Sequence, residues 1–137
     1  MTTVTNKEVL LIAKEQDVVP LRSKVKEYGV NIGMSILNQT RLITAASELV
    51  RNLLKYGGGG KVTIESVSNA RDLGVRITFI DKGAGIQDIS LAMQDGYSTG
   101  KSLGLGLPGA KRLVNEFHIH TELGNGTTIT IVKWNKG

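Results

Sequence analysis

The sequence lacks cysteine entirely, in a chain of 137 residues. This excludes a disulfide framework, a thiolate zinc site and catalysis by a cysteine nucleophile, and it fits a reducing compartment. Long apolar runs are missing as well. No segment approaches the roughly 18 consecutive apolar residues of a membrane-spanning helix, and the first residues, MTTVTNKEVLLIAKEQ, lack the apolar core of a signal peptide. We therefore expect a cytoplasmic protein with no membrane partner.

Aromatic side chains are scarce, at 4% of the residues. The formal net charge is +5, from 17 Lys and Arg against 12 Asp and Glu, and a basic balance can indicate nucleic acid, an acidic protein surface or a phosphate ligand. No basic stretch is interleaved with aromatic residues that could stack on bases. A solvated basic surface is the simpler interpretation, and we expect no nucleic-acid partner.

Hydrophobic residues make up 40% of the chain and charged residues 21%, which is enough apolar surface for one compact domain over residues 1–137. Apolar patterns predict five strands, at residues 8–13, 61–67, 75–80, 118–123 and 127–134. Helical spacing predicts three helices: from a cap at Asp17 to Gly29, over residues 35–56, and from within residues 104–109 to Phe117. The order β-α-α-β-β-α-β-β favours an α+β fold, a two-layer sandwich with helices on one face of a mixed sheet.

The longest predicted helix, residues 35–56, carries two stripes. One is apolar and repeats at helical spacing: Leu42, Ala46, Leu49, Val50, Leu53 and Leu54. The other is polar: Thr44, Glu48, Arg51, Asn52 and Lys55. The first stripe should pack in the core, and the second should face solvent or a site. Glu48 and Asn52 are four residues apart, so their side chains project from neighbouring positions on one face.

Three glycine clusters lie at expected element boundaries, at residues 81–85, 104–109 and 124–126. Each of them alone could be only a turn. Residues 104–109 satisfy G-x-G-x-x-G, but no strand is expected directly before them and no parallel crossover after them, so we reject a dinucleotide-binding fold. Residues 96–102 read G-x-x-x-G-K-S, one residue short of the P-loop spacing, and we reject that interpretation too.

The polar stripe and the glycine clusters together form an ordered set. Residues 48–52 (ELVRN), 81–85 (DKGAG), 104–109 (GLGLPG) and 124–127 (GNGT) resemble, in order, the N, G1, G2 and G3 boxes of the GHKL (Bergerat-fold) ATPase and kinase superfamily. Within it the chain is most similar to the serine/threonine switch-protein kinases of the bacterial stressosome and to the anti-sigma-factor kinases, from about Lys7 to Trp134. Two positions depart from family patterns: Tyr56, where several branches have histidine, and Ala84, where proline is common.

The resemblance implies ATP and Mg²⁺ as cofactors and assigns roles on the long helix. Asn52 would supply an amide oxygen to Mg²⁺ that is held mainly by phosphate oxygens and water. Glu48 would accept the proton of the attacking hydroxyl or orient it. The alternative for both residues is an ordinary exposed helix stripe, and the role of Arg51 stays open.

The adenine side of the expected site lies at the end of a strand. Asp81, followed by Gly83 and Gly85, could accept a hydrogen bond from the exocyclic amine of adenine, and this favours adenine over guanine because guanine has a carbonyl there. The two glycines would let the backbone lie against the base. Thr127 would be a second adenine-side contact through water, although an ordinary strand threonine is an almost equal alternative.

The phosphate side of the expected site lies in the segment that matches the ATP lid and the G2 box. Lys101 is the nearest cation for the outer phosphates, unless it is only solvated. Gly104 and Gly106 precede the last helix, where amide hydrogens and the helix dipole could meet phosphate. His118 and His120 alternate on a strand without carboxylates at ligand spacing, so we interpret them as surface residues rather than metal ligands.

We therefore expect an ATP- and Mg²⁺-dependent serine/threonine protein kinase. Its resemblance implies STAS-domain proteins as substrates in a stress-signalling or sigma-factor switch, with a PP2C-type phosphatase as a possible second partner that it activates. Two rivals remain: an anti-sigma factor that acts mainly by binding a sigma subunit, and a plain ATPase, which would hydrolyse ATP steadily without a protein acceptor.

Overall fold

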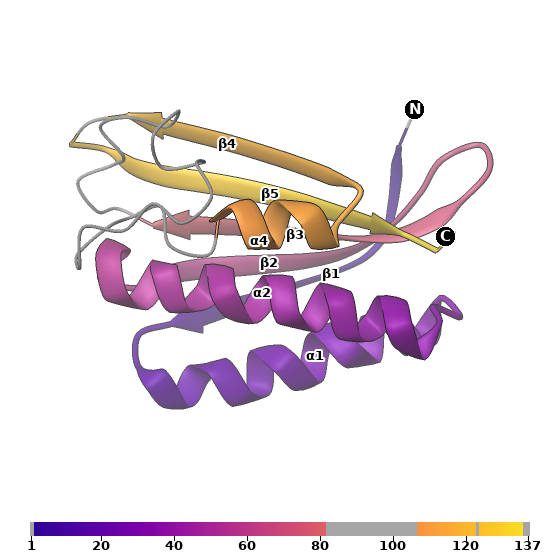
Figure 1. Cartoon of the computed structure of the whole chain (residues 1–137), viewed down its shortest axis with the longest axis horizontal. Helices are drawn as coiled ribbons and strands as arrows, with labels where there is room; N and C mark the ends of the chain where they lie inside the picture. The colour runs from indigo at the N-terminus through magenta and orange to yellow at the C-terminus, as the bar shows by residue number, and fades with distance from the viewer. Residues whose placement is uncertain (1, 82–106, 123, 136–137) are drawn as a thin grey trace.

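The computed structural model describes residues 2–81, 107–122 and 124–135 (Figure 1). In chain order the elements are β1 (Thr3–Ile12), a short 3-10 helix η1 (Glu15–Asp17), α1 (Val18–Asn31), α2 (Ile36–Gly57), β2 (Gly60–Ser68), β3 (Leu73–Asp81), α4 (Leu107–Leu113), β4 (Glu116–Glu122) and β5 (Gly126–Trp134). The five predicted strands and three predicted helices are all present. The α+β class is confirmed.

The strands form one sheet in the order β1-β2-β3-β5-β4. All four pairings between these strands are antiparallel, so the expectation of a mixed sheet is wrong for the described strands. A crossover through one helix joins two parallel strands. The chain between β1 and β2 instead runs through two helices, α1 and α2, and β2 is therefore antiparallel to β1. Strand β4 runs in the same direction as β3, but β5 lies between them. The connection through α4 therefore joins two strands of the same direction that do not pair with each other, and α4 leads into the antiparallel hairpin of β4 and β5.

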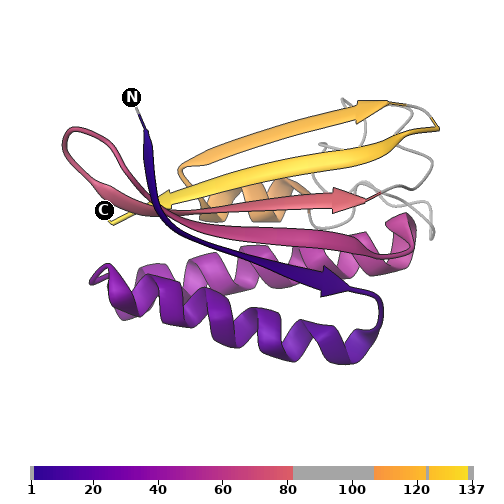
Figure 2. The same ribbon diagram turned by 180° about the vertical axis from the view of Figure 1, so that it is seen from behind.

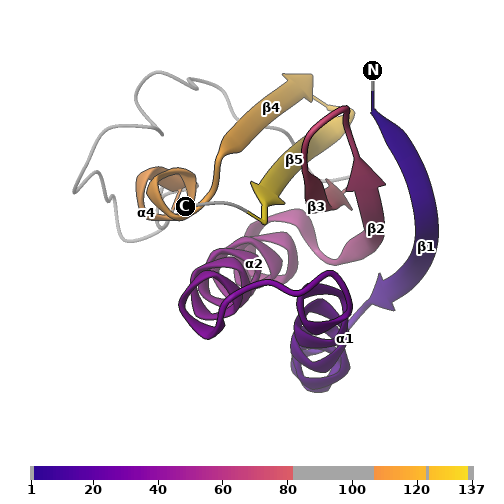
Figure 3. The ribbon, with the colours of Figure 1, turned by 90° about the vertical axis from the view of Figure 1, so that its right-hand side faces the viewer.

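The helices and the sheet form two layers. Figure 3 shows α1, α2 and α4 on one side of the sheet, and α2 packs against both of the other helices. The start of β1 and the end of β5 lie at one end of the molecule, whereas α2 finishes at the other end (Figures 1 and 2). Within the described ranges no helix is both long and apolar enough to cross a membrane.

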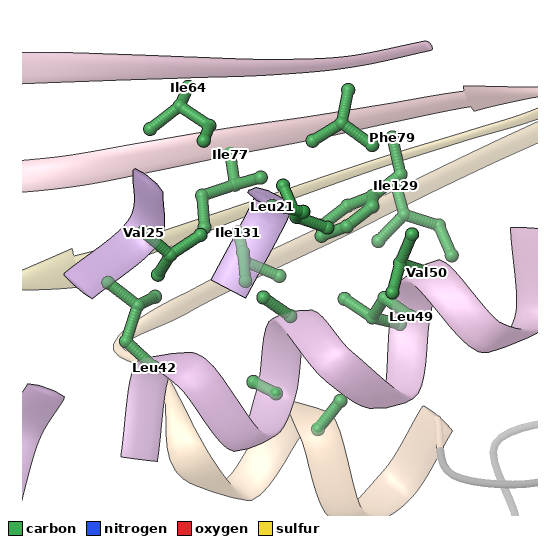
Figure 4. Close-up of a cluster of buried hydrophobic side chains, with 14 of the residues drawn as sticks. Leu21, Val25, Leu42, Leu49, Val50, Ile64, Ile77, Phe79, Ile129 and Ile131 are labelled. Atoms are coloured by element: carbon green, nitrogen blue, oxygen red, sulfur yellow. The ribbon is translucent and has the colours of Figure 1, made fainter. Parts of the chain in front are cut away.

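The core fills the space between the two layers. Alternate residues of the central strands, among them Ile64, Ile77, Phe79, Ile129 and Ile131, point toward the helices and are buried (Figure 4). They meet the apolar stripes of α1 and α2, which include Leu21, Val25, Leu42, Leu49 and Val50. The apolar stripe predicted for the long helix is therefore the one that packs against the sheet.

Helix α1 begins and ends differently from the prediction. Asp17 accepts hydrogen bonds from the backbone amides of Ala13 (2.9 Å) and Lys14 (3.0 Å) rather than from α1, and these two bonds lower the pKa of its carboxyl group. Gly29 is buried inside the helix. A Cβ atom there would lie 3.3 Å from Gln39 Cγ, so the small residue lets α1 and α2 approach closely. The helix ends at Asn31, and the left-handed residue that follows is Gly33, with φ +77°.

Helix α2 begins and ends almost where the sequence predicts. Ser35 has extended backbone, and its hydroxyl accepts a hydrogen bond from the amide of Asn38 at 3.1 Å, which caps the helix. At the other end Gly58 adopts the left-handed conformation with φ +73°. The amide of Gly59 then donates to the carbonyl of Leu53 at 2.9 Å and completes the helix end.

The last helix is shorter than predicted. α4 ends at Leu113, and Phe117 belongs to β4, where it pairs with Ile131 instead of closing the helix. The chain turns at Asn115, whose side-chain oxygen accepts a hydrogen bond from the amide of Trp134 at 2.7 Å. Its own amide donates to the carbonyl of Val132. These two bonds fix the start of β4 against β5.

Candidate functional site

The polar stripe of α2 faces away from α1. Gln39 marks the side of α2 that faces α1, because its Cγ would lie 3.3 Å from a Cβ on Gly29. Glu48 follows Gln39 by nine residues, or about two and a half helical turns, and so lies on the opposite side. Asn52 is one turn further along and shares the face of Glu48. Figure 3 shows α2 between α1 and α4, so the side of α2 opposite α1 is the side nearer to α4.

Glu48 and Asn52 are half-buried, at the border between packed and exposed surface of α2. Arg51 Nη1 lies 3.6 Å from Glu48 Oε1, and both side chains of this pair remain substantially exposed, at 51% and 42%. A pair this exposed contributes little to stability. The arrangement leaves a carboxylate and a neutral amide on one helix face, with a guanidinium beside the carboxylate.

Asp81 lies at the end of β3, directly against the last turn of α2. A Cβ atom on Gly57 would lie 2.6 Å from Asp81 Cβ and 2.8 Å from Asp81 Oδ2, so only glycine leaves room for this carboxylate. Asp81 Oδ1 accepts a hydrogen bond from the amide of Thr127 at 3.1 Å. The carboxylate is therefore held between the end of α2 and the start of β5.

The two halves of the predicted site are arranged along α2. Glu48 precedes Gly57, the residue that touches Asp81, by nine residues, which is roughly 14 Å along the helix axis, and Asn52 precedes it by roughly 8 Å. Asp81 thus lies against the end of α2, and Asn52 and then Glu48 follow at increasing distance from it along the helix axis.

Thr127 is buried, with 7% of its surface exposed, and lies next to Asp81 on the face of the sheet that carries the core. Its hydroxyl oxygen is 3.0 Å from the hydroxyl oxygen of Thr121 on β4. Thr121 also donates toward the carbonyl of Gly126 at 3.3 Å. Three neighbouring strands therefore contribute one polar side chain each to the same small region.

Five predicted site residues lie outside the described part of the chain: Gly83, Gly85, Lys101, Gly104 and Gly106. Their predicted contacts with the base and the phosphates stay predictions. The helix expected to begin within residues 104–109 does begin there, at Leu107. Of the predicted site, the structure thus describes Glu48, Asn52, Asp81 and Thr127.

Sequence reasoning missed two residues of this region. Gly57 was assigned only to the glycine run that closes the helix, although its lack of a side chain makes room for Asp81. The sequence signal that could have identified Gly57 is its position, a glycine in the last turn of the helix that carries the polar stripe. Thr121 gave no signal of its own, because its contact with Thr127 depends on the register between β4 and β5.

His118 and His120 point to the outer face of the sheet and are exposed, as predicted. Each of them lies near one carboxylate of its own strand. His118 Nε2 is 3.8 Å from Glu116 Oε1, and His120 Nε2 is 3.2 Å from Glu122 Oε1. The bond from His120 lowers the pKa of Glu122, with a smaller effect from Asn125. No group of three or more ligating side chains in the described ranges could hold a metal ion.

Comparison with known proteins gives the context of this geometry. Residues 37–136 match the family described as histidine kinase-, DNA gyrase B-, and HSP90-like ATPase. The chain is 42% identical to the serine/threonine-protein kinase RsbT of Bacillus subtilis over 123 residues, covering 90% of this chain and 92% of that protein. It is 30% identical to an anti-sigma F factor of Clostridium beijerinckii, covering 89% of each chain.

A solved structure supports the fold. The chain superposes on a structure of the RsbU and RsbW domains of Rv1364c from Mycobacterium tuberculosis with a TM-score of 0.67 and 23% sequence identity. The match covers 97% of this chain and 34% of that longer chain. At this identity the likeness concerns the arrangement of the helices and strands.

Proposed function

The chain belongs to the histidine kinase-, DNA gyrase B-, and HSP90-like ATPase family and is an ATP-using serine/threonine protein kinase, and we propose that STAS-domain proteins of a bacterial stress or sigma-factor switch are its substrates. In this proposal the chain transfers the γ-phosphoryl group of ATP to a serine or threonine hydroxyl. When not engaged with its substrate, the same domain binds and activates a PP2C-type phosphatase. One observation carries the nucleotide site: Asp81 packs against the end of the same helix that displays Glu48 and Asn52.

The adenine end of the site is built from Asp81 and Thr127. The backbone amide of Thr127 holds Asp81 Oδ1 at 3.1 Å, so the carboxylate is oriented before any ligand arrives. A carboxylate accepts hydrogen bonds only, and the exocyclic amine of adenine is a donor at the corresponding position. Gly83 and Gly85 would lie against the base. This donor–acceptor match supports ATP as the nucleotide.

The phosphate end of the site is built from α2. Mg²⁺ prefers oxygen ligands and keeps several of its waters. Asn52 offers a neutral amide oxygen on a half-buried helix face, and Glu48 lies one turn earlier, so the donor set on this face fits the ion. When bound, Mg²⁺ would neutralise phosphate charge. Lys101, Gly104 and Gly106 are the proposed contacts to the remaining phosphate oxygens.

Glu48 is the proposed general base. Its carboxylate would accept the proton of the substrate hydroxyl while the hydroxyl oxygen attacks the γ-phosphorus and ADP leaves. The exposure of Glu48, at 42% of its side chain, suits a base that must meet a hydroxyl brought by another protein. Arg51 Nη1 lies 3.6 Å from this carboxylate.

Phosphotransfer from labelled ATP to candidate STAS-domain proteins tests this proposal. Glu48→Gln and Asn52→Ala should each lower the rate of transfer about 100-fold or more, because removal of a positioned base or phosphate-side ligand has effects of this size. Glu27→Gln is the matched control. It removes an exposed carboxylate that pairs with Lys24 on α1, and should leave the rate unchanged.

The outcomes separate the proposed kinase from its rivals. Transfer by Asn52→Ala at the native rate would remove Asn52 from the site, and ATP hydrolysis that is steady without any acceptor would favour a plain ATPase. Similarity to anti-sigma F factors supports a second candidate function, binding of a sigma subunit. A pull-down in which the chain retains a sigma factor but no STAS-domain protein would favour that function.

A further inference from the structure

Two cations lie close together near the start of α2. Strand β5 ends at the end of the molecule where α2 begins (Figure 1), and its residue Lys133 is 4% exposed. Lys133 faces the helix layer, because Ile131 on the same side of the strand and the cross-strand neighbour Val75 both belong to the core. Burial lowers the pKa of Lys133, and the like charge of the half-buried Arg41 on α2 lowers it further. The two side chains therefore concentrate positive charge between α2 and the end of β5.

Neither cation forms an ion pair with a carboxylate in the part of the chain that the structure describes. Arg41 Nη1 donates a hydrogen bond to Asn38 Oδ1 at 3.2 Å, and Asn38 is itself buried. This bond anchors the guanidinium group but uses only one of its five N–H donors. Two like charges that are partly withdrawn from water oppose folding. An anion supplied by another molecule would relieve that cost, so the region is suited to bind one.

Arg41 lies on the same face of α2 as the proposed general base. Four residues follow one another at intervals of four, three and four, the spacing of a single stripe along a helix: Leu37, Arg41, Thr44 and Glu48. Leu37, at the start of this stripe, is 59% exposed although it is apolar. Arg41 precedes Glu48 by seven residues, which is about 10 Å along the helix axis. The stripe thus leads from the general base, past the cation, to an exposed leucine.

The stripe extends away from the proposed nucleotide site. Asp81 packs against Gly57 at the end of α2. Arg41 lies on the other side of Glu48, nearer the start of the helix. A protein that brings a hydroxyl to Glu48 therefore has the nucleotide on one side of that hydroxyl and this stripe on the other. We propose that Arg41, with the charge of Lys133 behind it, binds a carboxylate of the substrate protein, about 10 Å from the hydroxyl that receives the phosphoryl group. This inference rests on the proposed kinase function.

The chemistry of this stripe fits an acidic side chain with an apolar neighbour. A guanidinium group pairs with a carboxylate through two parallel N–H···O bonds. Lys133 is too buried to be the first contact, so Arg41 meets the carboxylate and Lys133 adds charge where water is scarce and charges interact more strongly. Leu37 contacts an apolar side chain of the substrate protein, and such a contact excludes water from the neighbouring ion pair. The substrate protein is thereby held by a surface that the nucleotide does not occupy.

Steady-state phosphotransfer to a STAS-domain protein that the native chain phosphorylates tests the inference. Arg41→Gln can still donate to Asn38 but has no charge. We expect it to raise the KM for the substrate protein about tenfold, the worth of one charge-assisted hydrogen bond. The KM for ATP should change less than about twofold, because the loss lies in binding of the protein. Lys133→Met should raise the KM for the substrate protein by a smaller factor, and Arg41→Lys, which keeps the charge, should lose less than Arg41→Gln.

Arg22→Gln is the matched control, because it removes an exposed cation of α1 and should leave every constant unchanged. If the native chain transfers phosphate but Arg41→Gln keeps the native KM for the substrate protein, the docking site is wrong while the kinase function stands. An equal rise in the KM for ATP would assign Arg41 to the nucleotide and also overturn the inference. If the native chain phosphorylates no STAS-domain protein, the proposed function fails, and the docking site fails with it. Should Arg41→Gln not fold, Lys133→Met replaces it in the test, and an unchanged KM for the substrate protein would equally count against the site.

Discussion

Lys133, near the end of β5, is a cation with 4% of its surface exposed. It shares the helix-facing side of the strand with Ile129 and Ile131, and its cross-strand neighbour is the fully buried Val75. No carboxylate in the described part of the chain forms an ion pair with its ammonium group, and the cation Arg41 acts on it as a like charge. Burial, and to a lesser degree Arg41, lowers the pKa of Lys133. A buried cation of this kind opposes folding.

Replacing Lys133 with Met should therefore stabilise the protein. Methionine has a similar length and shape but no charge to desolvate, and we expect the free energy of unfolding to rise by about 1 kcal/mol. Urea unfolding at neutral pH measures the change. Lys26→Met on the exposed side of α1 is the control and should change stability by less than about 0.5 kcal/mol. A destabilised Lys133→Met would mean that the ammonium has a stabilising partner.

The stability gain from Lys133→Met should also depend on pH. Because the pKa of Lys133 is lower in the folded state than in the unfolded state, the unfolded chain binds the extra proton between the two pKa values. The native protein therefore gains stability as the pH rises through the folded-state pKa toward 10.5, the ordinary value. The methionine variant lacks this gain. The difference between the two should be largest at neutral pH and shrink under alkaline conditions.

At the scale of single elements, the cap of α2 contributes a separable amount of stability. The hydroxyl of Ser35 accepts the amide of Asn38, one of the donors that the start of a helix leaves without a partner. Ser35→Ala should lower the free energy of unfolding by about 1 kcal/mol, whereas Ser35→Asn should largely preserve it, because asparagine also caps well. Ser23→Ala, at an exposed position within α1, provides the control and should show no loss. Equal stability of Ser35→Ala and the native protein would contradict the capping role.

The elements differed in how well the sequence predicted them. α2 was predicted almost to the residue, because its cap, its apolar stripe and its terminal glycines are all local signals. The end of α1 was not, because Gly29 serves the contact with α2 rather than a turn, and a close contact between helices leaves no local mark. Phe117 was assigned to the wrong element for a related reason: its place in β4 depends on hydrogen bonds between Asn115 and distant residues of β5.

At the scale of the whole molecule, the candidate site combines predictable spacing with unpredictable register. The positions of Glu48 and Asn52 on one helix face follow from a spacing of four residues. The approach of Asp81 to Gly57 and to Thr127 does not, because it requires the order of strands in the sheet and the registers of β2 with β3 and β3 with β5. Only the resemblance to a family linked these segments before the structure was known. The order of the elements predicted a mixed sheet, but the pairings of the described strands are all antiparallel.

Because the proposed nucleotide site joins the helix layer to the sheet, ATP binding should stabilise the whole domain. A ligand at 100 times its dissociation constant adds about 2.7 kcal/mol to the free energy of unfolding. Asp81→Asn should abolish most of this gain. Its retained oxygen can still accept the amide of Thr127, so the fold survives, but its new amino group faces the donor of adenine. Ile77→Val, a core variant, is the control: it should lower stability by about 1 kcal/mol yet keep the full gain from ATP. Urea unfolding with and without ATP measures both quantities, and an Asp81→Asn protein that gains as much as the native one would show that Asp81 does not bind the base.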